Sequence, residues 1–198
     1  MPYISRNPFN KEKLTKNKFA IIIISNIENS NKLITNLQNL LNNYTTNYLI
    51  NIIDSNHNLP NGYLYNIGFN IAKEHNCKFV IFHSAYLNPT IESIGNYLTY
   101  PIDPIIFHSL SKTEFILSIN INNFERFNKF SINSLNILND LTKYLKKNKI
   151  NLNYSAISSY NIIDNKVIKK KNKQKINNTY KIKLSIKINK NTNYYLIK

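Results

Sequence analysis

Short apolar segments, each the length of one β-strand, alternate with amphipathic segments between residues 19 and 83. The runs at 19–24, 48–54 and 78–83 predict strands, because a strand that is buried on both faces of a parallel sheet reads as a continuous apolar run. The segments 29–43 and 64–75 predict helices, because their apolar residues recur at spacings of three and four. Strands and helices in strict alternation indicate an α/β fold with right-handed crossover connections.

The rest of the chain has a less regular pattern. It predicts a strand at 102–107, a short helix at 112–118 and a longer helix at 134–147. Segment 181–188 alternates between apolar residues and mostly lysine, which is typical of a strand that is half exposed to solvent. Segment 194–197 adds a short last strand. We expect a single domain that spans residues 1–198.

Composition excludes several classes of protein. The one cysteine, Cys77, excludes a disulfide framework and a thiolate-rich metal site. No apolar run approaches the roughly 20 residues of a bilayer span, and the amino terminus lacks the apolar region of a signal peptide. We therefore expect a soluble protein in a reducing compartment. The abundance of Asn, Ile and Lys follows A/T-rich codons, which suits a large DNA virus or a protozoan.

The positive charge is concentrated at the carboxyl-terminal end. Residues 1–140 contain eleven cations and nine acids, a net charge of +2, whereas residues 141–198 contain fifteen lysines and one acid, a net charge of +14. Codon bias acts on both parts alike, so it does not explain the difference. Two interpretations remain open: a surface that binds a polyanion, and a lysine face that is only solvated. The candidate polyanion-binding residues are Lys169, Lys170, Lys171, Lys173, Lys175, Lys181, Lys183 and Lys187.

Several short motifs occur in an order that resembles the β-1,4-galactosyltransferase family. Tyr-Leu-Tyr-Asn-Ile-Gly-Phe at 63–69 resembles the family's Lys-Leu-Leu-Asn-Val-Gly-Phe helix start. The strand at 78–83 and the Leu-Asn-Pro at 87–89 match the frame of its Asp-Val-Asp-Leu-x-Pro motif. Leu-Ser-Lys-Thr-Glu-Phe at 110–115 resembles its Leu-Ser-Lys-x-x-Phe helix. The resemblance covers roughly residues 18–125, and it implies a GT-A type fold: a Rossmann-like mixed sheet flanked by helices.

The resemblance also implies a nucleotide-sugar-binding core, at 18–140. The charge distribution and the strands expected at 181–188 and 194–197 make residues 141–198 a basic, β-rich part. In the family, a UDP-sugar and a divalent metal bind at the two aspartates of Asp-Val-Asp. Ser84 and Tyr86 occupy these positions here and are neutral, so we expect a degenerate donor site without a cofactor. The family's Trp-rich acceptor segment is absent, since this chain has no Trp, and Phe124–Phe130 runs in its place.

Two histidines are weak metal candidates. His83 and His108 each follow Ile-Phe at the end of a predicted strand, so their imidazoles could converge if the two strands were neighbours. The alternative is that each histidine bonds to nearby loop backbone.

Three functions remain open. The first is a galactosyltransferase-like domain that has lost catalysis and serves as a structural or binding module, whose basic part contacts a polyanion or a protein assembly. The second is an active, divergent glycosyltransferase, in which cationic side chains replace the metal at the leaving diphosphate. The third is a non-specific nucleic-acid-binding protein.

Overall fold

The computed structural model describes residues 17–25, 27–55, 59–111, 114–127, 129–131, 137–156, 159–163 and 182–197. Their largest element is a sheet of eight strands. In spatial order these are Asn153–Tyr154 (β7), Ile105–Ser109 (β5), Phe115–Asn120 (β6), Phe79–His83 (β3), Phe19–Ile24 (β1), Tyr48–Ser55 (β2), Thr192–Ile197 (β10) and Ile182–Asn189 (β9). A second, two-stranded sheet consists of Leu87–Pro89 (β4) and Tyr160–Ile162 (β8).

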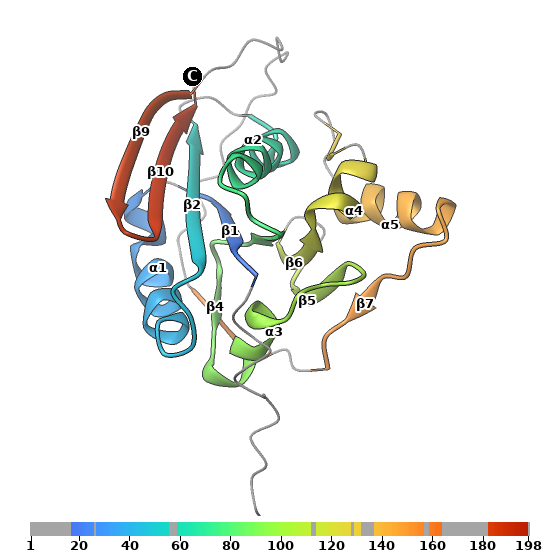
Figure 1. The fold of residues 1–198 in the computed structure, drawn as a ribbon, viewed down its shortest axis with the longest axis horizontal. Coiled ribbons are helices and arrows are strands. Elements are labelled where there is room, and N and C mark those ends of the chain that lie inside the picture. Colours follow the sequence, from blue (N-terminus) through green and yellow to red (C-terminus); the bar gives the residue numbers. More distant parts are fainter. Residues whose placement is uncertain are drawn as a thin grey trace, which may run out of the picture.

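The sheet has parallel and antiparallel parts. Strands β1, β2, β3 and β10 are parallel to one another, whereas β6 is antiparallel to β3 and β5, and β9 is antiparallel to β10. The helical elements are Ile27–Leu41 (α1), Asn61–Glu74 (α2), Ile91–Ser93 (η1), Ile94–Leu98 (α3), Ile121–Arg126 (α4) and Ile137–Lys147 (α5). Figure 1 shows β9 and β10 beside β2 at one side of the molecule, and β7 and α5 at the other. The expected α/β fold with a mixed sheet flanked by helices is confirmed.

The two long helices of the first half pack on opposite faces of the sheet. Leu33 and Leu37 of α1 are fully buried in one core cluster, together with side chains from one face of β1 and β2. Phe69 and Ala72 of α2 are fully buried in the other cluster. Because successive strand residues point to opposite faces, each strand of the sheet centre supplies both cores. This explains the continuous apolar runs from which the strands were predicted.

Gly68 lets α2 approach β1 closely. A Cβ atom at this position would lie 2.4 Å from Cγ2 of Ile22 and 3.3 Å from Cγ1 of Ile53, and both side chains are fully buried. Neither can move without disturbing the packed sheet. The glycine of the Asn-Ile-Gly-Phe motif therefore sets the distance between the helix and the sheet.

Two expectations for the second half are wrong. Where a short helix was expected at 112–118, the described residues from Phe115 form β6, whose six residues are all buried between β3 and β5; residues 112 and 113 lie outside the described residues. The apolar side chains of β6 pack on both faces of the sheet, so burial overrides the helical spacing. The expected strand at 102–107 begins later, at Ile105, because Ile102 is 80% exposed and Pro104 precedes the first paired residue.

The carboxyl-terminal strands join the sheet through β10. It pairs in parallel with β2, and β9 then forms the outer edge. The strands expected at 181–188 and 194–197 are confirmed as β9 and β10 within one residue at most ends. Ile182, Ile186 and Ile188 of β9 remain 41–46% exposed. The expected helix at 134–147 is confirmed as α5 from Ile137; residues 134–136 and the loop at 165–178 lie outside the described residues.

We expect the substitution Gly68→Ala to destabilise the protein by about 2 kcal/mol, because the added methyl group overpacks the interface between α2 and β1. An exposed helical glycine would respond in the opposite direction, since alanine has the higher helix propensity by about 1 kcal/mol. Urea unfolding measures the difference. Glu74→Ala, at an exposed position of the same helix, is the control and should change stability by less than about 0.5 kcal/mol.

Candidate functional site

The winding of the sheet reverses between β1 and β3. The chain leaves β1 through α1 to reach β2 on one side, and then returns through α2 to β3 on the other side. The helices that follow β1 and β2, α1 and α2, therefore pack on opposite faces of the sheet. In open α/β sheets, ligands bind in the crevice outside the carboxyl ends of the strands at such a point. This edge of the sheet is the candidate site.

Ser84 and Tyr86 lie at the carboxyl end of β3. Ser84 is 3% exposed, and its amide donates to the carbonyl of Phe115 at 3.0 Å, which extends the pairing of β3 with β6. The amide of Tyr86 donates to Oγ of Ser84 at 3.1 Å, so the serine side chain also shapes the turn towards β4. Both residues are therefore at the edge where the resemblance placed them. Their assignment as degenerate donor positions stays a prediction.

A carboxylate that the sequence analysis did not single out lies beside Ser84. Because β6 runs antiparallel to β3, its amino end meets the carboxyl end of β3, and Glu114 directly precedes β6. The Ser84 hydroxyl donates a hydrogen bond to Oε2 of Glu114. The carbonyl of Glu114 accepts from the amide of Leu110 at 2.8 Å, which closes the turn between β5 and β6. The site is thus built by two segments thirty residues apart in the chain.

The charge of Glu114 is only partly compensated. Burial raises the pKa of its carboxyl above the usual value, although the hydrogen bond from Ser84 acts in the opposite direction. Burial and the nearby Glu114 charge also raise the pKa of the Tyr86 and Tyr65 hydroxyls. Within the described segments no cationic side chain forms a salt bridge with Glu114. The site therefore presents one carboxylate that a bound cation would stabilise.

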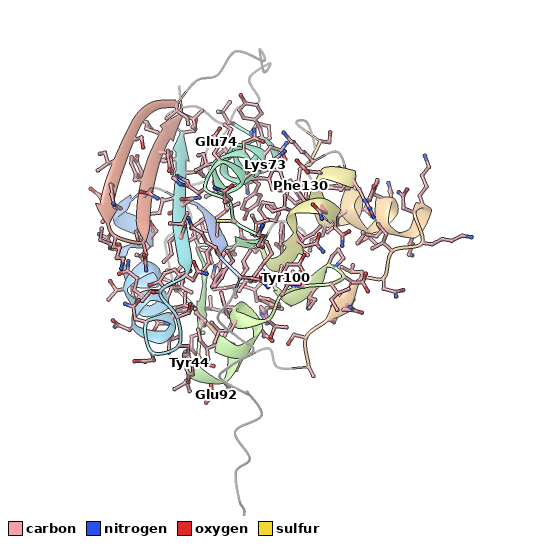
Figure 2. The ribbon with its side chains drawn as sticks, viewed as in Figure 1. Tyr44, Lys73, Glu74, Glu92, Tyr100 and Phe130 are labelled. Carbon is pink, nitrogen blue, oxygen red and sulfur yellow. The ribbon has the colours of Figure 1, made fainter. Side chains whose placement is uncertain are left out.

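An aromatic segment lies beside α2 and packs into the core between α2, α4 and the sheet. Phe130 donates from its amide to Oδ1 of Asn66 at 3.0 Å, and its carbonyl accepts from Nδ2 of Asn66 at 2.8 Å. Phe130 is 2% exposed, and it packs against the rings of Tyr65, Phe82, Phe124 and Phe127. Figure 2 shows it between α2 and α4. The phenylalanines of the segment that the resemblance aligned with the family's Trp-rich acceptor segment are therefore part of the hydrophobic core.

The two candidate histidines do not converge. His83 of β3 and His108 of β5 are both opposite Ile116 of β6, so β6 separates the two strands. The condition on which the two-histidine hypothesis rested is therefore not met. His108 lies against the ring of Tyr160, with centroids 5.3 Å apart. Among the described residues, no group of three His, Cys, Asp or Glu side chains is placed to hold a metal ion.

His83 is a buried, neutral histidine. Its Nδ1 donates to the Ser84 carbonyl at 2.7 Å, because a carbonyl can only accept, and its Nε2 accepts from the Tyr97 hydroxyl at 2.7 Å. Burial lowers the pKa of His83 to about 4, although the bond to the Ser84 carbonyl opposes this shift. With both nitrogens engaged, the ring has no lone pair left for a metal.

Most of the candidate polyanion-binding lysines lie outside the described residues. These are Lys169, Lys170, Lys171, Lys173, Lys175 and Lys181, together with the side chain of Lys183. Lys187 is exposed on β9, the edge strand of the sheet, and Lys190 is exposed in the turn that follows. Four further lysines are exposed on α5 or directly after it: Lys143, Lys146, Lys147 and Lys149.

Comparison with models of protein families and with curated proteins found no match. Solved structures do match. The catalytic domain of Drosophila β1,4-galactosyltransferase 7, in complex with xylobiose, superposes with a TM-score of 0.73 at 15% identity, over 91% of this chain and 93% of that chain. A mutant of that enzyme, in complex with manganese, UDP-Gal and xylobiose, gives a TM-score of 0.72 with the same identity and coverage. A mannosyltransferase from Pyrobaculum calidifontis, in complex with GDP-Man and Mn2+, gives 0.58 at 10% identity, over 72% of this chain and 55% of that chain.

The chain has a GT-A type glycosyltransferase fold. The fold expected from the galactosyltransferase motifs is thereby confirmed. The expectation of a site without any cofactor is wrong as an inference from this fold, because two of these structures are complexes with manganese and a nucleotide sugar. That expectation rested on the loss of two aspartates and overlooked Glu114. In the described part of the chain, no helix is long and apolar enough to cross a membrane.

We expect the stability of the protein to fall as the pH decreases from 7.5 to 5, in part because of His83. Its pKa is lowered on folding, so its contribution is fully present above about pH 6.5 and is lost as the pH falls towards 4. At pH 5 the loss amounts to about 2 kcal/mol. Urea unfolding of the protein and of His83→Gln at both pH values measures it. An equal loss in the variant would show that other groups cause the acid sensitivity.

Proposed function

We propose that this chain is a galactosyltransferase-like module that binds a nucleotide sugar with a divalent cation at the carboxyl ends of β1 and β3, and that it does not transfer the sugar. The observation that carries the proposal is the pair of Ser84 and Glu114, which brings a carboxylate to the switch point of a GT-A type fold. The complexes of similar structures with UDP-Gal or GDP-Man and manganese support the choice of ligand.

The donor set at this edge fits a cation that arrives with a diphosphate. Manganese and magnesium are hard ions that take oxygen ligands, and they are commonly held by one or two carboxylates together with substrate phosphates. Glu114 would supply the carboxylate, and Ser84 the hydroxyl that holds it in place. The cation would neutralise part of the diphosphate charge, which favours binding of the nucleotide.

The proposed loss of transfer rests on the groups around the site. A transferase of this kind needs a base for the acceptor hydroxyl as well as ligands for the cation. Glu114 can serve only one of these roles. Glu125 cannot serve the other, because its salt bridge with Lys73 holds it near the carboxyl end of α2, at the opposite end of β3 from the candidate site. The aromatic core around Phe130 replaces the acceptor segment of the family. These features support donor binding more strongly than catalysis.

We expect UDP-Gal to bind in the presence of manganese without formation of a transfer product. Isothermal titration calorimetry measures binding, and chromatography of a reaction with UDP-Gal, manganese and xylobiose detects transfer; GDP-Man is measured in parallel. The double variant Ser84→Asp/Tyr86→Asp should not form product either, because the acceptor segment is still absent. Product formation by the native chain would instead establish the active, divergent transferase. Failure of both nucleotide sugars to bind would refute the proposal.

A second function is favoured by the charge distribution. We propose that the basic carboxyl-terminal part binds a polyanion, as a separate activity of the same chain. The exposure of Lys187 and Lys190 at the edge of the sheet supports it, as does the net charge of +14 over residues 141–198. Lysine is a point charge, so we expect contacts with phosphate or sulfate groups and little sequence preference.

Replacing Lys169, Lys170, Lys171, Lys173 and Lys175 with Gln should weaken binding of DNA, RNA and heparin. On duplex DNA the log–log salt dependence should become shallower by about 0.9 for each phosphate that the variant no longer neutralises. The matched control replaces five lysines of the amino-terminal part, Lys11, Lys13, Lys16, Lys18 and Lys32, with the same change in net charge. Equal weakening in both variants would indicate that net charge alone, rather than a defined surface, attracts the polyanion.

A further inference from the structure

One carboxylate oxygen of Glu114 accepts a hydrogen bond from Ser84, and the other could bind a ligand. Its Oε2 accepts the hydrogen bond from Ser84, and Ser84 is itself fixed by the amide of Tyr86, which donates to its Oγ at 3.1 Å. No hydrogen bond from a described residue ends on Oε1. The carboxylate is therefore oriented by the protein on one side and has a free ligand position on the other.

The protein supplies too few ligands to hold a cation alone. Magnesium and manganese prefer octahedral coordination by oxygen, and at the carboxyl end of β3 the pair of Glu114 and Ser84 supplies one carboxylate and one neutral hydroxyl. Among the described residues, no group of three or more His, Cys, Asp or Glu side chains is placed to complete such a set. The remaining positions must be filled by water or by the phosphates of the ligand. The order in which cation and nucleotide can bind follows from this shortage.

We propose that Glu114 couples the two ligands, so that the cation binds this chain tightly only together with a nucleoside diphosphate. This inference rests on the proposed function, since it concerns the same site. By linkage, if the nucleotide increases the affinity for the cation, then the cation increases the affinity for the nucleotide by the same factor. Glu114 is therefore the residue through which each ligand increases the affinity for the other.

The coupling gives Glu114 two opposite effects on the nucleotide. Without a cation, the carboxylate and the diphosphate are both negative, so they repel one another. With the cation between them, both are attracted to it. Removal of the charge should therefore strengthen binding of the bare nucleotide and weaken binding of its manganese complex. A residue that only supports the fold would weaken both, so the change of sign separates the two roles.

The test measures UDP affinity by calorimetry for the native chain and for Glu114→Gln, each with and without manganese. For the native chain we expect manganese to strengthen UDP binding by about tenfold or more, within the range of ordinary coupling. In Glu114→Gln this gain should fall below about twofold, and bare UDP should bind about twofold tighter than to the native chain. Electron paramagnetic resonance of free Mn2+ gives an independent readout: the native chain should bind manganese alone only at about millimolar concentrations, and much more tightly once UDP is added.

Two further variants keep the result interpretable. Glu92→Gln removes an exposed carboxylate on η1 and should leave the manganese gain unchanged (Figure 2). Glu114→Asp keeps the charge on a shorter side chain and should retain part of the manganese gain. This variant also tests the inference if Glu114→Gln does not fold. An unchanged gain in Glu114→Gln, with UDP still bound, would overturn this inference and leave the proposed function standing. If the native chain binds neither UDP nor GDP, with or without manganese, this inference and the proposed function are both overturned.

Discussion

The close contact of α2 with β1 at Gly68 is the constraint on which the rest of the site depends. Because Ile22 leaves no room for a Cβ atom there, the helix lies directly on the sheet centre. One turn earlier, this depth places Tyr65 in the core near Glu114 and lets the Asn66 amide bond twice to the backbone of Phe130. The position of the aromatic cluster around Phe130 and the electrostatic surroundings of Glu114 thus follow from a helix–sheet distance that a single glycine permits.

The elements that the sequence predicted correctly are those whose pattern is local. The three parallel strands and the two helices between them each show their own period, and the structure has all five. The second half was harder because its burial is decided by distant partners. Phe115–Asn120 is a strand because β3 and β5 pair with it on both sides. The sequence of the segment itself does not predict which strands will be its neighbours. The insertion of β10 next to β2 likewise joins segments about 140 residues apart, as in the hydrogen bond from Tyr194 to Asp54.

The same distinction separates the site residues that were found from the one that was missed. Ser84 and Tyr86 could be placed because they directly follow a recognisable buried strand. Glu114 could not, because it reaches Ser84 only when β6 turns back against β3. The strand that brings Glu114 into the site also stands between His83 and His108 and keeps them apart. A single unrecognised strand therefore accounts both for the missed carboxylate and for the failed histidine pair.

The charge at the carboxyl end of β3 decides how such a site can work. The resemblance aligns the neutral residues Ser84 and Tyr86 with two aspartates of the family, and the carboxylate beside Ser84 belongs to Glu114, directly before the opposing strand β6. A site with a single negative charge attracts a divalent cation less strongly than a site with two, but it also repels a diphosphate less strongly. Part of the affinity for the cation must then come from the phosphates. A change in the number and origin of the carboxylates can thus convert a site that holds its cation alone into one that binds cation and nucleotide jointly, while the fold around it stays the same.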